Sequence, residues 1–196
     1  MKLKRWEIGL MVGVTLLVLT CGIPVYQQGQ LADKLTRLHV VANSDTAEDQ
    51  ALKLRVRDAV LAEIRPEDQA EDPALLLRLQ TAAEKVMAEE GVEQTVRVYR
   101  TRMFFDTRVY DTFSLPAGMY DAVRVELGAA RGRNWWCVLF PPLCAGACQE
   151  DLEEIGAGAG LTEQEISYIS GNGTNYVIRF KIAEWWGRMY SWFSSL

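Results

Sequence analysis

Hydrophobic residues recur along the chain with two different periods, and the changes of period predict the order of its helices and strands. Residues 35–41 read as a first strand. Steps of three and four residues then predict two amphipathic helices, from Ala47 to Ile64 and from Pro73 to about residue 90. The second of these begins after the capping residue Asp72 and ends at Gly91.

The middle of the chain has the period of strands. We expect four of them, over residues 96–104, 108–115, 120–127 and 135–140. Because the returns between consecutive strands are short, antiparallel pairing of neighbours is expected. The last of the four ends at a double proline, since neither ring can donate a hydrogen bond to a ladder.

The C-terminal part predicts two short helices, a final strand and an aromatic helix. The two helices, 149–155 and 161–168, flank a flexible glycine tract at 156–160, and residues 175–181 alternate as a strand. Large apolar residues then follow at helical spacing: Ile182, Trp185, Trp186, Met189, Tyr190 and Phe193. This aromatic helix either docks on the core or lies at a membrane interface.

Taken together, the expected elements form an α+β fold, within the broad α/β class. Its centre is a mostly antiparallel sheet of about five or six strands. The two amphipathic helices of the N-terminal half pack on this sheet, and the aromatic helix stands at the C-terminus.

The first 28 residues have the order of an export signal. Lys2, Lys4 and Arg5 precede a stretch from Ile8 to Val25 that contains no charged residue. As a helix this stretch would be about 27 Å long at about 1.5 Å per residue, close to the thickness of a bilayer core. We therefore expect export, through a cleaved signal peptide or a signal anchor at 1–28, with residues 29–196 forming a single extracytoplasmic domain.

Composition is that of an ordinary globular domain, and charge excludes one class of partner. The 196 residues are 49% hydrophobic and 24% charged, with a formal net charge of -5. An acidic chain without a run of basic residues is a poor binder of nucleic acid, so nucleic acid is not expected as a partner.

No group of residues has the pattern of a catalytic or metal site. His39 is the only histidine, and a packed or edge histidine in a strand is the favoured interpretation. Asp45, Glu48 and Asp49 could bind calcium, but their spacing lacks the glycine turn of a calcium loop. Capping of the following helix by Asp45 or Thr46 explains them better. We predict no catalytic residue, metal, cofactor or small-molecule substrate, and hence no enzyme.

The stretch Asn134–Cys144 combines two tryptophans, two prolines and two cysteines. Adjacent strand residues point to opposite faces, so either one of the tryptophans is core and the other anchors a partner, or both are covered. Cys137 and Cys144 lack the Cys-x-x-Cys spacing of redox sites, and they form a disulfide or remain free thiols. The predicted partner-binding residues are Trp135, Trp136, Phe140, Pro141 and Pro142.

Long motifs in this order resemble the stage II sporulation protein R family. The first is His39-Val-Val-Ala-Asn-Ser-Asp45, followed by residues 48–60. The second is the segment 110–118, followed by the Asn134–Cys144 stretch, and residues 180–185 resemble the family's C-terminal block. The resemblance implies a signal and no chemistry of its own. Proteins of this family are made in the forespore of endospore-forming bacteria and exported into the space between the two septal membranes.

The resemblance also implies a partner. Members trigger a membrane-embedded aspartic protease, which removes the pro-sequence of the sigma factor precursor pro-sigma-E and so couples forespore to mother-cell gene expression. The membrane would be contacted through the N-terminal segment. Two alternatives remain at this stage: an exported cell-wall hydrolase that uses Asp45, Glu48 or Asp111, and a membrane-tethered scaffold protein.

Overall fold

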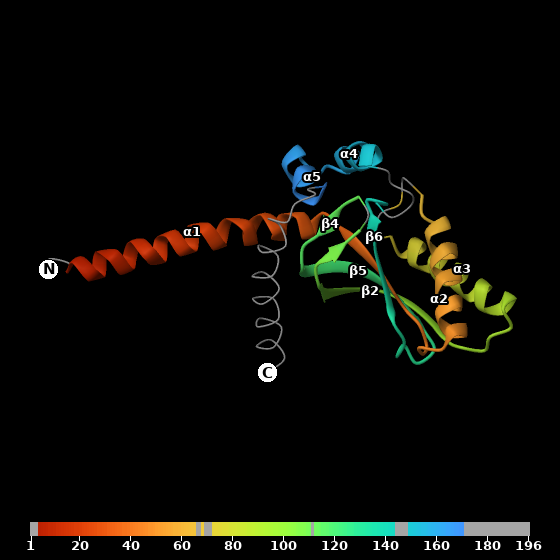
Figure 1. Cartoon of the computed structure of the whole chain (residues 1–196). Helices are drawn as coiled ribbons and strands as arrows, with labels where there is room; N and C mark the ends of the chain where they lie inside the picture. Colours follow the sequence, from red (N-terminus) through yellow and green to blue (C-terminus); the bar gives the residue numbers. More distant parts are fainter. Residues whose placement is uncertain (1–3, 66–67, 69–71, 111, 144–148, 171–196) are drawn as a thin grey trace.

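A four-stranded mixed sheet in the order β2–β5–β1–β6 forms the centre of the protein (Figure 1). In this computed structural model the placement of the chain is described for residues 4–65, 68, 72–110, 112–143 and 149–170, without the side chains of residues 16–28 and 149–151. The four strands are β1 (Thr36–Val41), β2 (Val96–Phe105), β5 (Gly118–Leu127) and β6 (Asn134–Phe140).

Pairing in the sheet differs from the expected run of antiparallel neighbours. β5 and β6 follow each other along the chain, yet β1 lies between them, parallel to β5 and antiparallel to β6. All six residues of β1 are buried, which is the property of a central strand covered on both faces. β2 pairs with β5 in an antiparallel ladder, although the expected strand 108–115 was predicted to lie between them.

The expected strand 108–115 is also different. It consists of β3 (Arg108–Val109) and β4 (Ser114–Leu115), which pair as a separate two-stranded sheet. A turn joins them, closed by the hydrogen bond from the Tyr110 amide to the Phe113 carbonyl, and the rings of these two residues stack 4.5 Å apart. The aromatic pair therefore favours a hairpin over one continuous strand.

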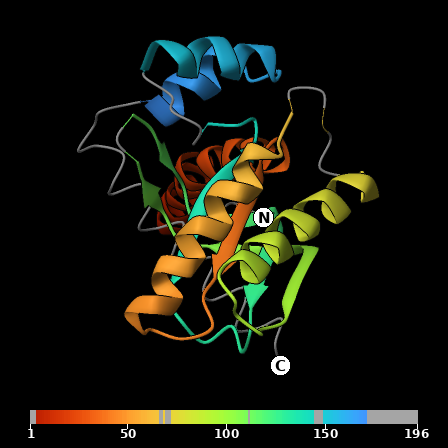
Figure 2. The same ribbon diagram turned by 90° about the vertical axis from the view of Figure 1, so that its right-hand side faces the viewer.

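One face of the sheet is covered by α2 (Ala47–Ala62) and α3 (Pro73–Glu89), which cross it side by side (Figure 2). Both predicted helices are confirmed, and the Asp72 side chain caps α3 by accepting the Ala74 amide at 2.8 Å. The buried core of this first face is aliphatic apart from one cysteine and one methionine: Leu38, Val40, Leu52, Val56, Val60, Leu75, Leu79, Ala83, Met87, Val96, Val123, Val125, Leu127, Cys137 and Leu139.

The second face is covered by shorter pieces of the chain. These are the C-terminal end of α1 (Arg5–Asp33), the β3–β4 hairpin, α4 (Gln149–Gly158) and α5 (Glu163–Ser170). The predicted flexible glycine tract is wrong for residues 156–158, which continue α4. A Cβ on Gly156 would lie 3.1 Å from Ile166 Cγ1, so the glycine permits the close approach of α4 to α5.

α1 extends away from the sheet as a single long helix (Figure 1). Its C-terminal residues Leu31 and Ala32 are buried in the core of the second face. Within the described residues, no helix has the length and apolar character needed to cross a membrane. The predicted strand 175–181 and the aromatic helix beyond it lie outside the described residues.

Candidate functional site

The two tryptophans of β6 point to opposite faces, as the sequence predicts, and both are half-buried. Trp135 packs beside the aliphatic core of the first face, where the Arg57 guanidinium lies 5.0 Å from its ring centroid. Trp136 belongs to the second face. Each indole therefore packs against its own face of the sheet and keeps part of its surface exposed.

The other predicted partner-binding residues follow at the end of the same strand. Phe140 is half-buried beside the first core, Pro141 is buried and Pro142 is exposed. Cys137 is buried and disulfide-bonded. Cys144 lies outside the described residues, so its pairing with Cys137 stays a prediction. Trp135 and Phe140 of β6 pack beside the first core and Trp136 beside the second, so the predicted binding residues are divided between the two faces.

Trp136 forms an aromatic stack with His39 of β1. The two rings are 3.8 Å apart and nearly parallel, at 12°, and the edge of Phe105 meets the indole at 4.9 Å. The Arg108 guanidinium lies 5.3 Å from the indole centroid. This arrangement joins β1, β2, β6 and the start of β3 through one indole ring.

His39 is a packed histidine, as expected, in a central strand. Its side chain is 2% exposed, and Nε2 lies 2.8 Å from Asn134 Oδ1, while Nδ1 has no hydrogen-bond partner. Burial lowers the pKa of His39 to about 4, and the positive charges of Arg124 and Arg108 act in the same direction. The imidazole is therefore neutral at pH 7, and the described residues contain no group of His, Cys, Asp or Glu side chains around it that could hold a metal.

Arg37, two residues before His39, is a buried cation that the sequence reasoning missed. It is 0% exposed, with Nε donating to the Cys137 carbonyl at 3.0 Å and Nη2 donating to the Tyr110 hydroxyl at 2.8 Å. Its guanidinium lies 4.5 Å from the Phe105 ring centroid and 5.1 Å from that of Tyr120, while Nη1 has no hydrogen-bond partner. The available signal in the sequence was a single charged residue within an otherwise uncharged predicted strand, 35–41.

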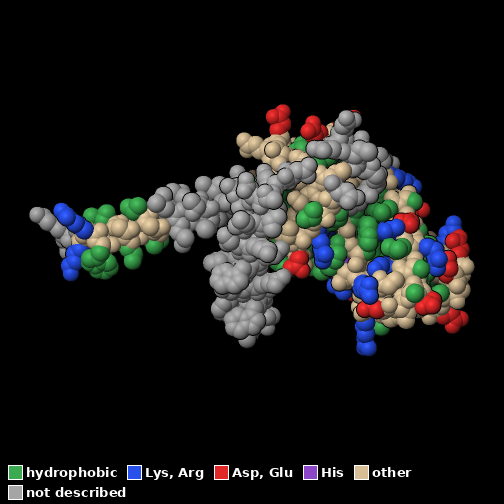
Figure 3. Space-filling model, in the orientation of Figure 1, with side chains coloured by type: hydrophobic (Ala, Val, Ile, Leu, Met, Phe, Trp, Pro, Cys, Tyr) green, Lys and Arg blue, Asp and Glu red, His purple; other side chains and the backbone are tan. Residues whose placement is uncertain are grey.

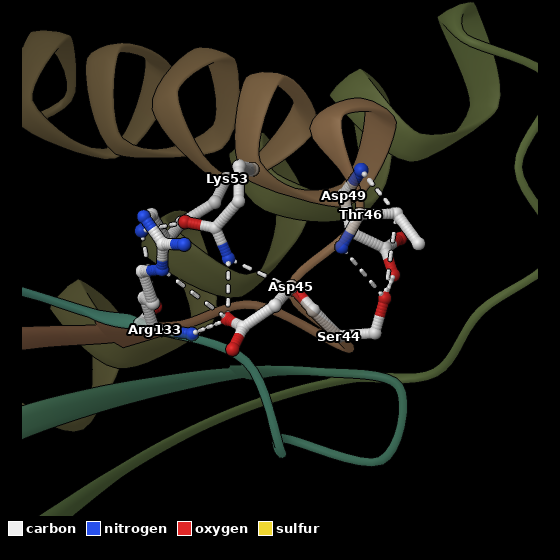
Figure 4. Close-up of polar contacts among 7 residues, drawn as sticks. Ser44, Asp45, Thr46, Asp49, Lys53 and Arg133 are labelled. Atoms are coloured by element: carbon white, nitrogen blue, oxygen red, sulfur yellow. Dashed lines mark hydrogen bonds and ion pairs between the residues drawn. The ribbon is translucent and has the colours of Figure 1, made fainter.

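A cluster of polar side chains lies in the loop between β1 and α2 (Figure 4). The Asp49 carboxylate accepts hydrogen bonds from Asn43 Nδ2, Ser44 Oγ and Gln94 Nε2. These bonds, that from Ser44 first, lower the pKa of Asp49. Thr46 caps α2 by accepting the Asp49 amide at 3.3 Å. Capping is thus confirmed, with Thr46 rather than Asp45 as the cap.

The same loop holds the turn between β5 and β6. Asp45 Oδ1 accepts the Arg133 amide at 2.7 Å, and Asn43 Oδ1 accepts the Ala129 amide at 2.8 Å. A Cβ at Gly132 would lie 2.1 Å from the Ser44 carbonyl oxygen, so only glycine fits against this loop. Asp45 and Asp49 therefore act as acceptors for the protein's own backbone and side chains, and the described residues contain no acidic or histidine cluster that could hold a metal.

A third group, centred on Glu126, lies on the second face beside His39. Glu126 is buried and accepts from the Tyr99 hydroxyl at 2.9 Å and from Arg97 Nη2 at 2.6 Å. Arg124 Nε lies 2.8 Å from Glu126 Oε1, although its N–H is not aligned for a hydrogen bond. Burial raises the pKa of Glu126, but the Tyr99 hydrogen bond and the charges of Arg124 and Arg97 lower it overall. The single buried carboxylate of Glu126 therefore forms ion pairs with two arginines.

Of the three carboxylates that an exported hydrolase would use, Asp45 is held in the loop contacts, Glu48 lies exposed in the first turn of α2, and Asp111 lies outside the described residues. The sequence motif that contains Asp45 and Asp49 therefore has a structural explanation in the join between β1, α2 and the β5–β6 turn.

Comparison with known proteins gives consistent results. Residues 32–150 match the model of the family described as stage II sporulation protein R, a range that includes the whole four-stranded sheet. The chain is similar to "Stage II sporulation protein R" of Bacillus subtilis (strain 168), with 33% identity over 189 residues, which covers 82% of this chain and 84% of that protein. No solved structure matches. The protein therefore belongs to the stage II sporulation protein R family, as its sequence motifs predict.

Proposed function

We propose that this chain is an exported sporulation signalling protein that activates a membrane-embedded aspartic protease, which then processes pro-sigma-E. The observation that carries the proposal is the family match over residues 32–150, together with the similarity to the Bacillus subtilis protein over most of both chains. The signal passes from forespore to mother cell, and the chain acts by binding its partner.

Three features of the fold support a protein that acts by binding. The polar side chains of the loop after β1 are used in internal contacts, with Asp49 accepting three side-chain hydrogen bonds. His39 is buried, and its pKa of about 4 keeps it uncharged near neutral pH. Half-buried Trp136 and Arg108 stand together at the surface of the sheet, and Trp and Arg are residue types that dominate binding interfaces.

Activation requires that the chain bind the active state of the protease more tightly than its inactive state. A ligand that shifts a two-state equilibrium from about 1:99 to about 99:1 needs a difference in affinity of about 10⁴-fold between the two states. A membrane tether on the signal would raise its local concentration near a protease in the opposing membrane. This raises the occupancy of both states alike, so the difference in affinity must come from the contacts themselves.

The proposed place of action is the space between the septal membranes, reached through the N-terminal segment. Figure 3 shows basic side chains at the tip of α1, followed by hydrophobic side chains over the next described turns. Trp6, Leu10 and Met11 are exposed there, at positions that have no contact with the sheet. Exposed apolar residues behind a basic end are suited to lipid, which supports a segment that enters the membrane during export.

Co-expression in a non-sporulating host tests the function directly. The protease and pro-sigma-E are produced with and without this chain, and the precursor and its product are separated on a gel. We expect processing only in the presence of this chain, and loss of processing when residues 1–28 are deleted, since the domain then stays in the cytoplasm. Processing at the same rate without the chain would contradict the proposal.

Fractionation of the same cells tests localisation. N-terminal sequencing of the mature chain distinguishes a cleaved signal peptide, which gives a new N-terminus, from an anchor that retains Lys4 and Arg5. We expect protease added outside the cytoplasmic membrane to digest the domain in either case. A domain that is protected from digestion in intact spheroplasts would contradict export.

A further inference from the structure

One half of the second face, at the C-terminal ends of β1 and β5, has no helix of the described residues packed over it, and we refer to it as the open half. Two rows of register partners cross it, and residues in such rows share a face of the sheet. One row is Tyr99, Arg124, His39 and Trp136, and the next is Arg97, Glu126, Val41 and Asn134. The helices α4 and α5 and the end of α1 pack over the other half of this face, around Tyr120 and Ala122.

Positive charge is in excess on this open half. Arg97 and Arg124 share the single carboxylate of Glu126, with exposed side-chain fractions of 66% and 27%. Arg108 is half-buried above Trp136 and makes no ion pair with the described part of the chain. The whole chain carries a net charge of -5, so three arginines against one carboxylate form a local reversal of its overall sign.

The aromatic residues between these arginines are held rigidly. Trp136 is fixed by its stack on His39 at 3.8 Å and by the edge of Phe105, and the Tyr99 hydroxyl is fixed on Glu126. A preorganised side chain loses little conformational entropy when a partner binds. Half-buried Arg and Trp residues at the centre of a patch are the usual carriers of binding energy.

We propose that this arginine face, made of Arg97, Tyr99, Arg108, Arg124 and Trp136, binds an acidic segment of the partner protein. The guanidinium of Arg108 is the central contact, because its planar fork can take a carboxylate in two parallel hydrogen bonds and no described carboxylate already does so. The apolar parts of the acidic segment would lie on the Trp136 ring. The proposal rests on the proposed function, in which that partner is the membrane-embedded protease.

A protein segment fits this face better than a flat anionic surface. Glu126 lies between Arg97 and Arg124, and its negative charge would repel a continuous layer of anionic lipid headgroups there. A segment with separate carboxylates can place them over Arg108 and the outer edge of Arg97 while avoiding Glu126. Electrostatic attraction of this kind also speeds association, and salt weakens it.

The test uses the full-length chain in the co-expression assay, with Arg108→Glu as the main variant. Arg55→Glu is the matched control, because Arg55 lies on α2 on the other side of the sheet and makes only a surface pair with Glu90. We expect Arg108→Glu to reduce pro-sigma-E processing at least tenfold, Arg108→Lys to reduce it by a few fold, and Arg55→Glu to change it less than twofold. Circular dichroism of each purified variant must show a melting curve like that of the wild type.

Two further measurements make the outcomes distinct. Capture of the protease by the wild-type chain should weaken as sodium chloride rises from about 50 mM to about 500 mM, and Arg108→Glu should remove most of this dependence. Vesicles with about 30% phosphatidylglycerol should bind wild type and Arg108→Glu equally, because the arginine face is proposed to bind protein and both chains have the same N-terminal segment. If the face instead bound anionic lipid, the charge reversal would weaken vesicle binding. If wild type fails to cause processing, the proposed function itself is wrong. If wild type is active and a folded Arg108→Glu variant is equally active, or if the variant loses only vesicle binding, the arginine face is not the docking surface.

Discussion

The two faces of the central sheet are built on opposite principles. The first face is aliphatic, and two regular helices cover it (Figure 2). The second face buries Arg37 and His39 among aromatic rings, under a hairpin and several short helical pieces. The strands alternate between the two faces, so each strand contributes to both kinds of packing. The comparison indicates that one face supplies stability and the other keeps groups suited to recognition.

The largest expected effect is on the first face. Leu79 of α3 is 0% exposed in the aliphatic core, and Leu79→Ala should lower the free energy of unfolding by about 3 kcal/mol because it removes buried methyl groups and leaves a cavity. Leu77 lies in the same helix with 69% exposure, so Leu77→Ala is the control and should change stability by less than about 0.5 kcal/mol. Urea unfolding measures both. Equal losses would contradict the assignment of the two helix faces.

The second largest effect concerns the pH dependence of the second face. The pKa of His39 is about 4 in the folded chain and 6.5 as the ordinary value, so between these pH values the unfolded chain binds a proton that the folded chain does not. Stability from this group is fully present above pH 6.5 and falls as the pH falls towards 4, by at most about 3 kcal/mol. His39→Gln should flatten the stability curve between pH 6.5 and 4.5. An unchanged slope would show that other groups cause it.

An intermediate loss of stability is expected in the loop that joins β1 to α2. Asn43 accepts from the Ala129 amide and donates to Asp49, so Asn43→Ala leaves a backbone donor and a carboxylate short of one partner each. We expect a loss of about 2 kcal/mol. Asn43→Asp keeps the acceptor for Ala129 but places a second carboxylate beside Asp49, and its loss should grow with pH. Thermal melting at pH 5 and pH 8 compares the two variants.

The smallest expected effect on stability is at Arg37, and it tests whether the buried polar groups of the second face contribute to stability at all. Arg37 is buried without a carboxylate partner in the described structure, and one guanidinium nitrogen has no hydrogen bond. Replacement of a buried charge by an apolar side chain of similar length is often neutral or stabilising, so Arg37→Met should change stability by less than about 1 kcal/mol. A loss of more than about 3 kcal/mol would mean that its contacts with Phe105 and Tyr120 hold the second face together.

The sequence predicts the first face well and the second face poorly, for a physical reason. A helix such as α3 can be predicted from the regular helical spacing of Leu75, Leu79 and Ala83, because this spacing is a local property of the sequence. The position of β1 between β5 and β6 depends on pairing over about a hundred residues, which periodicity cannot express. The expectation of antiparallel neighbours was wrong for that reason.

The candidate binding residues show the same division. Trp135 and Trp136 are predicted on opposite faces because strand residues alternate, and the structure confirms it. The partners that fix them come from other elements: Arg57 from α2, and His39 and Arg108 from β1 and β3. These arginines are far apart in the sequence and come together on one face only in the assembled sheet. No run of basic residues therefore predicts the arginine face.

The central position of β1 has a consequence for the order in which the chain becomes a folded protein. β1 follows directly after α1, but its partners are residues 121–126 and 134–140. Contacts so distant along the chain slow folding, since a long loop must close before any of them forms. If the chain is exported as proposed above, with its N-terminal part crossing first, β1 would cross the membrane early. Both of its edges would then stay unpaired until β5 and β6 have crossed. Under that proposal, the topology would keep the domain extended during passage, and the domain would close only when almost the whole sheet has crossed the membrane.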